Sequence, residues 1–381
     1  MTFLEVPRPD LEDALLSRAR AGPPVVLAGP PGAGKTTLLR SLGRRLDAQG
    51  WAVVYLDLMA AASSPDRFVA AALEALPAER FGARLAEATA IRRLAAAGRE
   101  RGSEAVAALF ALWSSLDTAA GRPVALLLDE ATEIRSLAYF TGLRLVHQPF
   151  AQALESRGGG TLLATSFPTQ ARRLWSFEHV AAPPLSLTEV AALVPEAAAE
   201  AARRASFGWP RYVRAIAQGW RPGDDVAAAW AREMALGGRL ESACRHTYEI
   251  LLLRSRGYGI SKAVLGAVAH EEGLNLTALV VRLGRTPGAV RDYLHWLVGV
   301  DALKMVGKRY VYVDGLLRWW VRLYGRGSLP DDSEIARAAQ AVLESAEEPA
   351  PAPLHEAPGP QEAEAAPPAA AVRRDTLMEI D

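Results

Sequence analysis

Cysteine is nearly absent from this sequence, which has one, Cys244, among 381 residues. One cysteine cannot form an internal disulfide, which is typical of proteins in the reducing cytosol. The chain also lacks an uninterrupted apolar run of roughly 20 residues, the length that a membrane span needs, and its first residues lack the basic and apolar regions of a signal peptide. None of the 6 histidines has metal-ligand spacing with Cys244, so we expect no zinc site. These absences predict a cytoplasmic protein with no membrane partner.

The sequence has no excess of charge of either sign, because 43 Lys and Arg residues balance 43 Asp and Glu residues. That balance excludes a uniformly basic nucleic-acid coat protein and a wholly acidic disordered chain. The charge is unevenly placed: residues 240–327 have 13 basic and 7 acidic side chains, whereas residues 328–381 have 3 basic and 12 acidic ones. A chain of this length is expected to form more than one globular domain.

Four short apolar runs have the length and composition of buried strands. Helical patterns separate them, including one over residues 35–46 and about three helices in residues 66–120. Because alternating strands and helices build parallel sheets with helices on both faces, we expect an α/β fold. The four expected strands are residues 24–29, 52–58, 123–128 and 160–165.

A glycine-rich segment follows the first expected strand and opens the first expected helix. It fits the pattern G-x-x-x-x-G-K-[ST], whose glycines let backbone N–H groups point at phosphate oxygens. The N-terminal end of the following helix adds positive potential, Lys35 can reach the β- and γ-phosphates, and the Thr36 hydroxyl can ligate Mg²⁺. The segment predicts a nucleotide site formed by Gly29, Pro30, Pro31, Gly32, Ala33, Gly34, Lys35, Thr36 and Thr37.

Two acidic residues, Asp129 and Glu130, end the third apolar run. A carboxylate at the end of a wholly apolar strand is costly unless that end meets solvent or a cation. Paired with the glycine-rich segment, Asp129 is the expected partner for magnesium. Glu130 lies one residue further on, where a carboxylate can orient and polarise an attacking water. Its presence favours hydrolysis of the nucleotide over phosphorylation of a small acceptor.

Polar residues also follow the fourth apolar run. Thr165 and Ser166 end that run, where a hydroxyl can sense the γ-phosphate or position water; the alternative is that they cap the next helix. Arg172 and Arg173 come shortly after, and arginine is suited to stabilising the charge on a transferring phosphoryl group. An arginine pair on a solvated helix is as readily part of the surface, so a catalytic role is one of two interpretations.

Taken in order, these motifs resemble those of the P-loop ATPases of the AAA+/STAND lineage, especially the archaeal-type ATPases, over residues 1–325. Residues 6–12 resemble the lead-in that packs near the adenine, and residues 180–190 resemble the step into a helical lid. Residues 206–210 resemble the lineage's Gly-x-Pro motif, which implies that Pro210 lies beside the nucleotide base.

The resemblance has two gaps. The sensor asparagine of ordinary AAA+ enzymes is absent, and no unambiguous sensor arginine is present, although Arg211 and Arg214 follow Pro210. Both gaps favour a switch-like ATPase over a ring-forming motor.

Residues 245–315 have the expected order of three helices and a two-stranded ribbon, with the ribbon at residues 303–313. This order resembles the winged helix-turn-helix that follows the lid in archaeal-type ATPases. Basic side chains near its third helix and on its wing have the charge pattern of a DNA-binding module. Asp292 and Asp301 dilute that charge, however, and winged helices often bind protein instead. The residues expected to reach duplex DNA are Arg285, Arg291, Lys304, Lys308 and Arg309.

The acidic C-terminal region contains a low-complexity stretch, residues 347–372, which we expect to be disordered. The apolar and acidic segment that follows, residues 372–381, can dock on a partner or on the basic module of this chain. The alternative is a frayed end with no role.

The sequence predicts an ATP-binding, Mg²⁺-dependent ATPase that acts as a nucleotide-driven conformational switch. The expected fold class is α/β, a P-loop NTPase parallel sheet flanked by helices, followed by a helical lid and a winged helix-turn-helix domain. Two alternatives stay open: an ATP-dependent DNA-binding protein of the initiator or transposition-helper type, and a non-hydrolysing, nucleotide-gated scaffold. The expected domains are residues 1–184 for the ATPase core, 185–239 for the lid, 240–327 for the winged helix and 328–381 for a largely disordered acidic tail.

Overall fold

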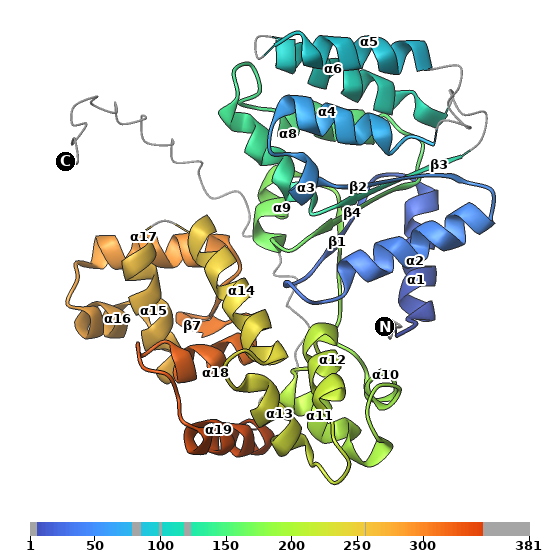
Figure 1. The fold of residues 1–381 in the computed structure, drawn as a ribbon. Coiled ribbons are helices and arrows are strands. Elements are labelled where there is room, and N and C mark those ends of the chain that lie inside the picture. The colour runs from blue at the N-terminus through green and yellow to red at the C-terminus, as the bar shows by residue number, and fades with distance from the viewer. Residues whose placement is uncertain (1–5, 78–84, 99–100, 118–122, 256, 346–381) are drawn as a thin grey trace, which may run out of the picture.

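The structure, a computed structural model, describes residues 6–77, 85–98, 101–117, 123–255 and 257–345. Its central element is a parallel sheet of five strands in the order β2-β3-β4-β1-β5 (Figure 1). All four strands expected from apolar runs are present. The fifth, at the sheet edge, is short and only partly buried, so no apolar run marks it in the sequence. The strands are β1 (Val25–Ala28), β2 (Ala52–Asp57), β3 (Val124–Asp129), β4 (Thr161–Thr165) and β5 (Glu178–Ala181).

Helices cover both faces of the sheet, because successive side chains of a strand point to opposite faces. On one face, Ala125 and Leu127 of β3 belong to a core that includes helices α1 (Pro9–Ala21) and α2 (Lys35–Ala48). On the other face, Leu126 and its neighbours pack in a second core with the helices between β2 and β5. Burial on both faces confirms the expected α/β fold, a parallel sheet flanked by helices. The helices that contribute to the second core are α3 (Leu58–Ala61), α4 (Pro65–Glu74), α5 (Leu85–Ala96), α6 (Gly102–Ser114), η3 (Ala131–Tyr139), α8 (His147–Glu155) and α9 (Pro168–Leu174).

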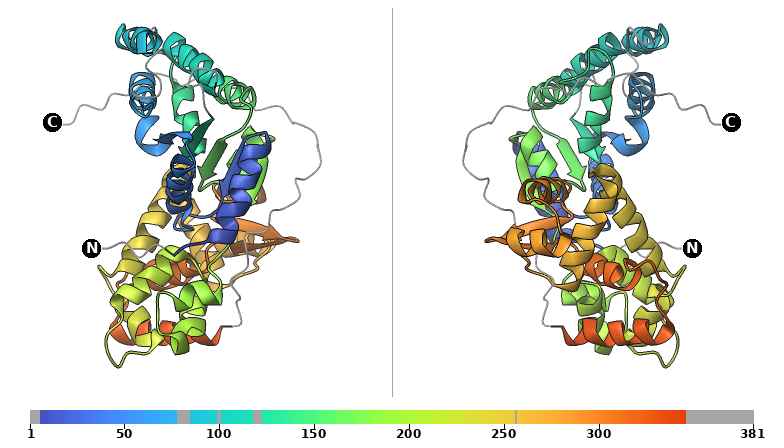
Figure 2. Two further views of the ribbon diagram at one scale, coloured as in Figure 1. Left: turned by 90° about the vertical axis from the view of Figure 1, so that its right-hand side faces the viewer. Right: turned by 90° about the vertical axis from the view of Figure 1, so that its left-hand side faces the viewer.

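The segment from residue 187 to residue 254 is helical and lies beside the sheet-containing core, as the two side views agree (Figure 2). Helix α12 begins at a proline that supplies the fixed φ of a first helical turn. Helix α19 (Asp332–Glu344) starts with a capping box and packs on α11 and α13. Residues 347–372, expected to be disordered, and the docking segment 372–381 lie outside the described residues. The helices of this region are α10 (Leu187–Ala191), η4 (Glu196–Ala198), α11 (Ala199–Ala205), α12 (Pro210–Gly219), α13 (Val226–Met234) and α14 (Arg239–Arg254).

The next segment has three helices followed by an antiparallel hairpin, the order that the sequence predicts. Asn275 and Thr286 cap the second and third helices with their side chains, and Gly284 ends the second helix in the left-handed conformation. Within the described ranges no helix has the length and apolar character to cross a membrane. The elements are α15 (Tyr258–His270), α16 (Leu276–Leu283), α17 (Pro287–Gly299), β6 (Leu303–Val306), β7 (Arg309–Tyr312) and α18 (Gly315–Tyr324).

Candidate active site

A cavity of about 980 Å³ opens where the carboxyl ends of β1, β3 and β4 meet helices α12 and α14. The volume is in the range of small-molecule sites, and ligands of open α/β sheets bind at this edge. Most of the residues predicted from separate motifs therefore lie around one space. The predicted residues on its wall are Pro31, Gly32, Ala33, Gly34, Lys35, Thr36, Thr37, Asp129, Glu130, Ser166 and Pro210.

The glycine-rich loop between β1 and α2 needs glycine at two positions. Gly32 has φ of +90° and Gly34 has φ of +84°, a region that residues with a side chain rarely adopt. The loop closes on itself through a hydrogen bond from the backbone N–H of Ala33 to the carbonyl of Pro30. These glycines let the loop curl ahead of α2, as phosphate binding requires.

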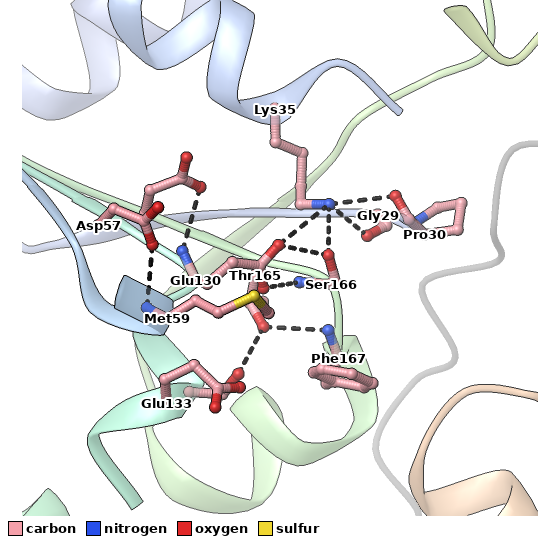
Figure 3. A network of polar contacts seen from close by, with 12 residues as sticks. Gly29, Pro30, Lys35, Asp57, Met59, Glu130, Glu133, Thr165, Ser166 and Phe167 are labelled. Atoms are coloured by element: carbon pink, nitrogen blue, oxygen red, sulfur yellow. Dashed lines mark hydrogen bonds and ion pairs between the residues drawn. The ribbon is translucent and has the colours of Figure 1, made fainter. Parts of the chain in front are cut away.

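The Lys35 ammonium is buried and surrounded by oxygen atoms. Its Nζ donates to the carbonyls of Gly29 at 3.0 Å and Pro30 at 3.1 Å and to Ser166 Oγ at 2.9 Å (Figure 3). The Glu130 Oε1 atom lies 3.9 Å away. Burial lowers the pKa of Lys35, and the Glu130 carboxylate opposes that shift. Phosphate oxygens could replace the carbonyls without leaving the ammonium unpaired.

Asp129 is buried at the end of β3, and both of its oxygens accept hydrogen bonds. Oδ2 accepts from Tyr55 Oη at 2.9 Å, and Oδ1 accepts from the backbone N–H of Glu130 at 3.1 Å. Burial and the nearby Asp129 carboxylate raise the pKa of Tyr55. The sequence does not predict Tyr55 as a site residue, because its only signal is a polar ring on the half-buried strand β2, which pairs with β3.

The donor set suits magnesium better than zinc. In the part of the chain that the structure describes, no three His, Cys, Asp or Glu side chains are arranged to hold a metal ion. Magnesium in nucleotide sites is typically held by one or two carboxylates together with substrate phosphates. Asp129 and the hydroxyl-bearing Thr36 lie on the wall of the same cavity, so these residues fit such an ion.

Glu130 and Ser166 form a close pair across two strand ends. Glu130 Oε2 accepts the backbone N–H of Ser166 at 2.9 Å, and Oε1 accepts the Ser166 hydroxyl at 2.5 Å. Glu130 also has φ of +47°, which is uncommon for a residue with a side chain. Because β4 lies between β1 and β3, Ser166 reaches both Lys35 and Glu130. We call this arrangement the paired pose.

Thr165 has a different environment from its neighbour. It is fully buried, and its hydroxyl lies 3.0 Å from that of Thr132 and accepts from the backbone N–H of Phe167. The structure therefore brings Ser166 into the cavity but not Thr165. The predicted contact of Thr165 with a nucleotide stays a prediction that its position does not support.

Arg172 and Arg173 lie on α9 and are not part of the cavity wall. The charge of Arg172 faces His179, whose pKa is lowered by burial and by this arginine. Arg173 lies beside Gly299 at the end of α17. Their catalytic role stays a prediction, because the structure does not bring them to the other site residues.

Helix α12 sits directly on the glycine-rich loop. The backbone N–H of Arg211 donates to the Gly32 carbonyl at 3.2 Å. A Cβ added to Gly32 would meet Arg211 Cβ at 2.9 Å, and one added to Gly34 would meet Pro210 at 3.5 Å. Arg211 and Arg214, which the sequence left unassigned as sensor arginines, both lie on the cavity wall.

The lead-in before α1 closes the other side of the cavity. Arg8 is buried; its Nε pairs with Glu189 Oε1 at 2.8 Å, and its terminal nitrogens donate to the carbonyls of Pro183 and Pro184. The lead-in is thereby tied to the start of α10. It lies on the wall of the cavity, where the resemblance to archaeal-type ATPases places the base.

Solved structures of other proteins are similar to this chain to different degrees. A Walker-type ATPase of Pyrococcus abyssi is similar with a TM-score of 0.64 and 17% identity, covering 84% of this chain and 96% of that one. The ORC2 protein of Aeropyrum pernix, in ADPNP–ADP complexes, has a TM-score of 0.42 and 15% identity, with coverage of 88% and 93%. The replication initiator DnaA, bound to AMPPCP and single-stranded DNA, has a TM-score of 0.29 and 16% identity, with coverage of 75% and 85%.

At these identities, the likeness to the Pyrococcus protein establishes the fold, and the two lower scores add nothing to it. No curated protein matches the sequence significantly. Residues 10–148 match the family model described as an AAA ATPase domain. The chain therefore has a P-loop NTPase fold, and its residues 10–148 are similar to the AAA ATPase domain family.

Proposed function

We propose that this chain binds ATP with Mg²⁺ and hydrolyses it, and that the nucleotide sets the relative orientation of three units. The proposed units are the core (residues 1–184), the lid (185–239) and a winged helix-turn-helix module (240–327), with residues 328–381 as an acidic tail. The observation that carries the proposal is the convergence of Lys35, Glu130 and Ser166 on one cavity whose opposite wall is α12.

The residues have separable roles. Lys35, with Arg211 and Arg214 across the cavity, supplies positive charge to the β- and γ-phosphates. Thr36 and Asp129 would hold Mg²⁺, which supplies further neutralisation of phosphate charge when bound. In the hydrolytic step the water oxygen bonds to the γ-phosphorus, the bridging oxygen leaves with ADP, and the Glu130 carboxylate takes the water's proton.

Two consecutive lid residues link the nucleotide loop to residues 240–327, which we call the C-terminal module. Arg211 bonds to Gly32, and Tyr212 Oη donates to Asp314 Oδ2 at 2.6 Å at the start of α18. A shift of α12 on binding ATP would therefore move the module as well. This gives the switch a physical path, because ATP bound between core and lid favours one orientation of the two.

Replacing Glu130 by glutamine tests hydrolysis. We expect phosphate release with Mg-ATP to fall about 100-fold or more, the usual effect of removing a general base, while ATP affinity changes only a few-fold. Glu155→Gln, on the exposed end of α8, is the matched control and should leave both values unchanged. Turnover that survives in Glu130→Gln contradicts the assigned role. If the parent protein binds ATP but does not hydrolyse it, the non-hydrolysing, nucleotide-gated scaffold is the function that remains.

A second candidate function, duplex DNA binding, is favoured by where the charges lie. The exposed basic side chains lie in the turn between α16 and α17, on α17 and on the hairpin, and they are Arg285, Arg291, Lys308 and Arg309. Burial raises the pKa of Tyr310 on β7 and the charge of Arg291 on α17 lowers it, so helix and hairpin charges face a common region. Asp301, which dilutes the charge in the sequence, is turned toward the core instead.

If this face binds DNA, affinity for a short duplex will fall steeply with salt, because bound phosphates release counterions. The double variant Arg291→Ala with Lys308→Ala should bind more weakly and lower the slope of log affinity against log salt by about 2. The matched control replaces Arg67 and Arg101 on the core. If the slope of log affinity against log salt is equal in the parent protein and the double variant, this face does not bind DNA. A protein is then the expected partner of the module.

A further inference from the structure

The C-terminal module contacts the core at two places near the site. After α17, the Asp301 carboxylate accepts the backbone N–H of Thr169 at 3.1 Å and the Thr169 hydroxyl at 2.6 Å. At the end of α14, Arg254 Nη1 pairs with Glu133 Oε1 at 2.6 Å, and its guanidinium lies 4.5 Å from the ring centroid of Phe167. We call the two contacts the latch.

Both contacts land on the segments that carry the reacting groups. Thr169 follows Ser166 by three residues, and Glu133 follows Glu130 by three residues. The two segments are themselves joined, because the hydroxyls of Thr132 and Thr165 lie 3.0 Å apart. Movement of the module would therefore reach Glu130 and Ser166 through short stretches of chain.

An aspartate at position 301 is not explained by a contribution to the stability of the fold. Its backbone has φ of +56°, a conformation uncommon for residues with a side chain. Burial raises the pKa of its carboxyl to about 6, against hydrogen bonds from Thr169 and the charges of Arg172 and Arg173, which lower it. An ionised carboxylate in this position costs free energy that a neutral side chain would avoid.

The paired pose has a consequence for hydrolysis. Both carboxylate oxygens of Glu130 accept hydrogen bonds from Ser166, and the Ser166 hydroxyl also accepts from Lys35. A carboxylate held in this way is directed at Ser166 rather than at an attacking water. Whatever holds the two segments together therefore favours slow turnover.

On this basis, and resting on the proposed ATPase function, we infer that Asp301 and Arg254 are positioning residues for the nucleotide site: the latch holds Glu130 and Ser166 in the paired pose and restrains ATP turnover. A partner that engages the C-terminal module and breaks the latch would raise turnover. The C-terminal module is then a source of restraint as well as a receiver of the nucleotide signal.

Steady-state hydrolysis by full-length variants tests the inference. Asp301→Ala and Arg254→Ala should each raise kcat at least about fivefold, the lower end of coupling between sites, with KM for ATP within about twofold. Reversing the ion pair with Arg254→Glu and Glu133→Arg together should restore the low kcat. Arg282→Ala is the matched control, because Arg282 pairs with Glu271 at the same 2.6 Å but within the module.

A purely structural role would lower kcat or leave it unchanged in folded variants, and either result overturns the inference. Loss of kcat restoration in the charge reversal also counts against it. If neither the parent protein nor the variants hydrolyse ATP, the proposed ATPase function fails, whether or not the latch exists. Hydrogen exchange of the backbone amides of residues 165–169 then tests whether the latch restrains this segment. Faster exchange in Asp301→Ala would support the latch, and unchanged exchange would overturn it.

Discussion

Lys35→Ala will weaken ATP binding by about 100-fold while leaving the chain folded. The Lys35 ammonium is buried among the carbonyls of Gly29 and Pro30 and the Ser166 hydroxyl, where phosphate oxygens would gain charge-assisted hydrogen bonds. Lys35 and a phosphate group of ATP would form a buried pair of opposite charges. Removing one partner of such a pair costs roughly 2–5 kcal/mol of binding free energy, and each 1.4 kcal/mol is about tenfold in affinity. Calorimetric titration with a slowly hydrolysed ATP analogue measures the loss.

The same substitution should change stability little without nucleotide. Burial lowers the pKa of Lys35, which means that the fold holds this ammonium at a cost. The control is Lys262→Ala, an exposed lysine on α15 outside the cavity wall, which should keep full affinity. Equal affinity in Lys35→Ala and the parent protein would place the nucleotide elsewhere.

Tyr212→Phe will destabilise the protein by roughly 2–4 kcal/mol near pH 8, and by less in acid. Tyr212 and Asp314 are both buried, and the Tyr212 hydroxyl is the side-chain donor to Asp314, whose other oxygen caps α18. Phenylalanine keeps the ring and removes the donor, so a buried carboxylate loses a hydrogen bond. Urea unfolding of both proteins at several pH values gives the difference in unfolding free energy.

The pH dependence has a definite sign. Burial raises the pKa of Asp314, while the Tyr212 hydroxyl and the nearby Arg211 lower it, so removing the hydroxyl raises this pKa further. A carboxyl whose folded pKa is raised contributes stability at low pH and loses that contribution as pH rises through the folded pKa. The deficit of Tyr212→Phe should therefore grow as the pH rises above 3.8, the ordinary pKa of an aspartate. The thiol of Cys244, also near Asp314, has its pKa raised by burial, so it does not produce this change in acid.

Tyr324→Phe is the matched control for this measurement. Tyr324 Oη donates at 2.8 Å to the neutral carbonyl of Met234, so its loss should cost about 1 kcal/mol regardless of pH. If the loss of unfolding free energy in Tyr212→Phe is equally independent of pH, the hydrogen bond from Tyr212 to an ionised Asp314 is not the interaction that stabilises the fold.

The sequence predicted the nucleotide loop and the acidic strand end because each depends on neighbours in the chain. Gly32 and Gly34 meet a local backbone requirement, and Lys35 follows them at the start of a helix whatever else the chain does. Asp129 is marked by the apolar run before it. The buried strands and capped helices were found in the same way, from periodicity and from capping residues.

Other parts of the site could not be read along the chain. Thr165 and Ser166 are adjacent and chemically alike, so the sequence does not tell which hydroxyl enters the site. In the structure Thr165 turns toward Thr132, whereas Ser166, at the end of the strand between β1 and β3, meets Lys35 and Glu130. Tyr55 reaches Asp129 because β2 pairs with β3 in register. Strand β5 escaped the apolar pattern because it is only 4 residues long and none of its side chains is fully buried.

The contacts of the C-terminal module with the core are also visible only in the structure. Asp301 is separated from Thr169 by 132 residues, and in the sequence it stands out only as an acidic residue that dilutes the basic charge of its module. Local chemistry determined where this chain has a phosphate loop, an acidic strand end and capped helices, since those features depend on residues a few positions apart. Only tertiary packing decided which hydroxyl meets the glutamate and which arginine of the lid meets the loop, because those contacts join segments whose separation in sequence carries no information about their distance in space.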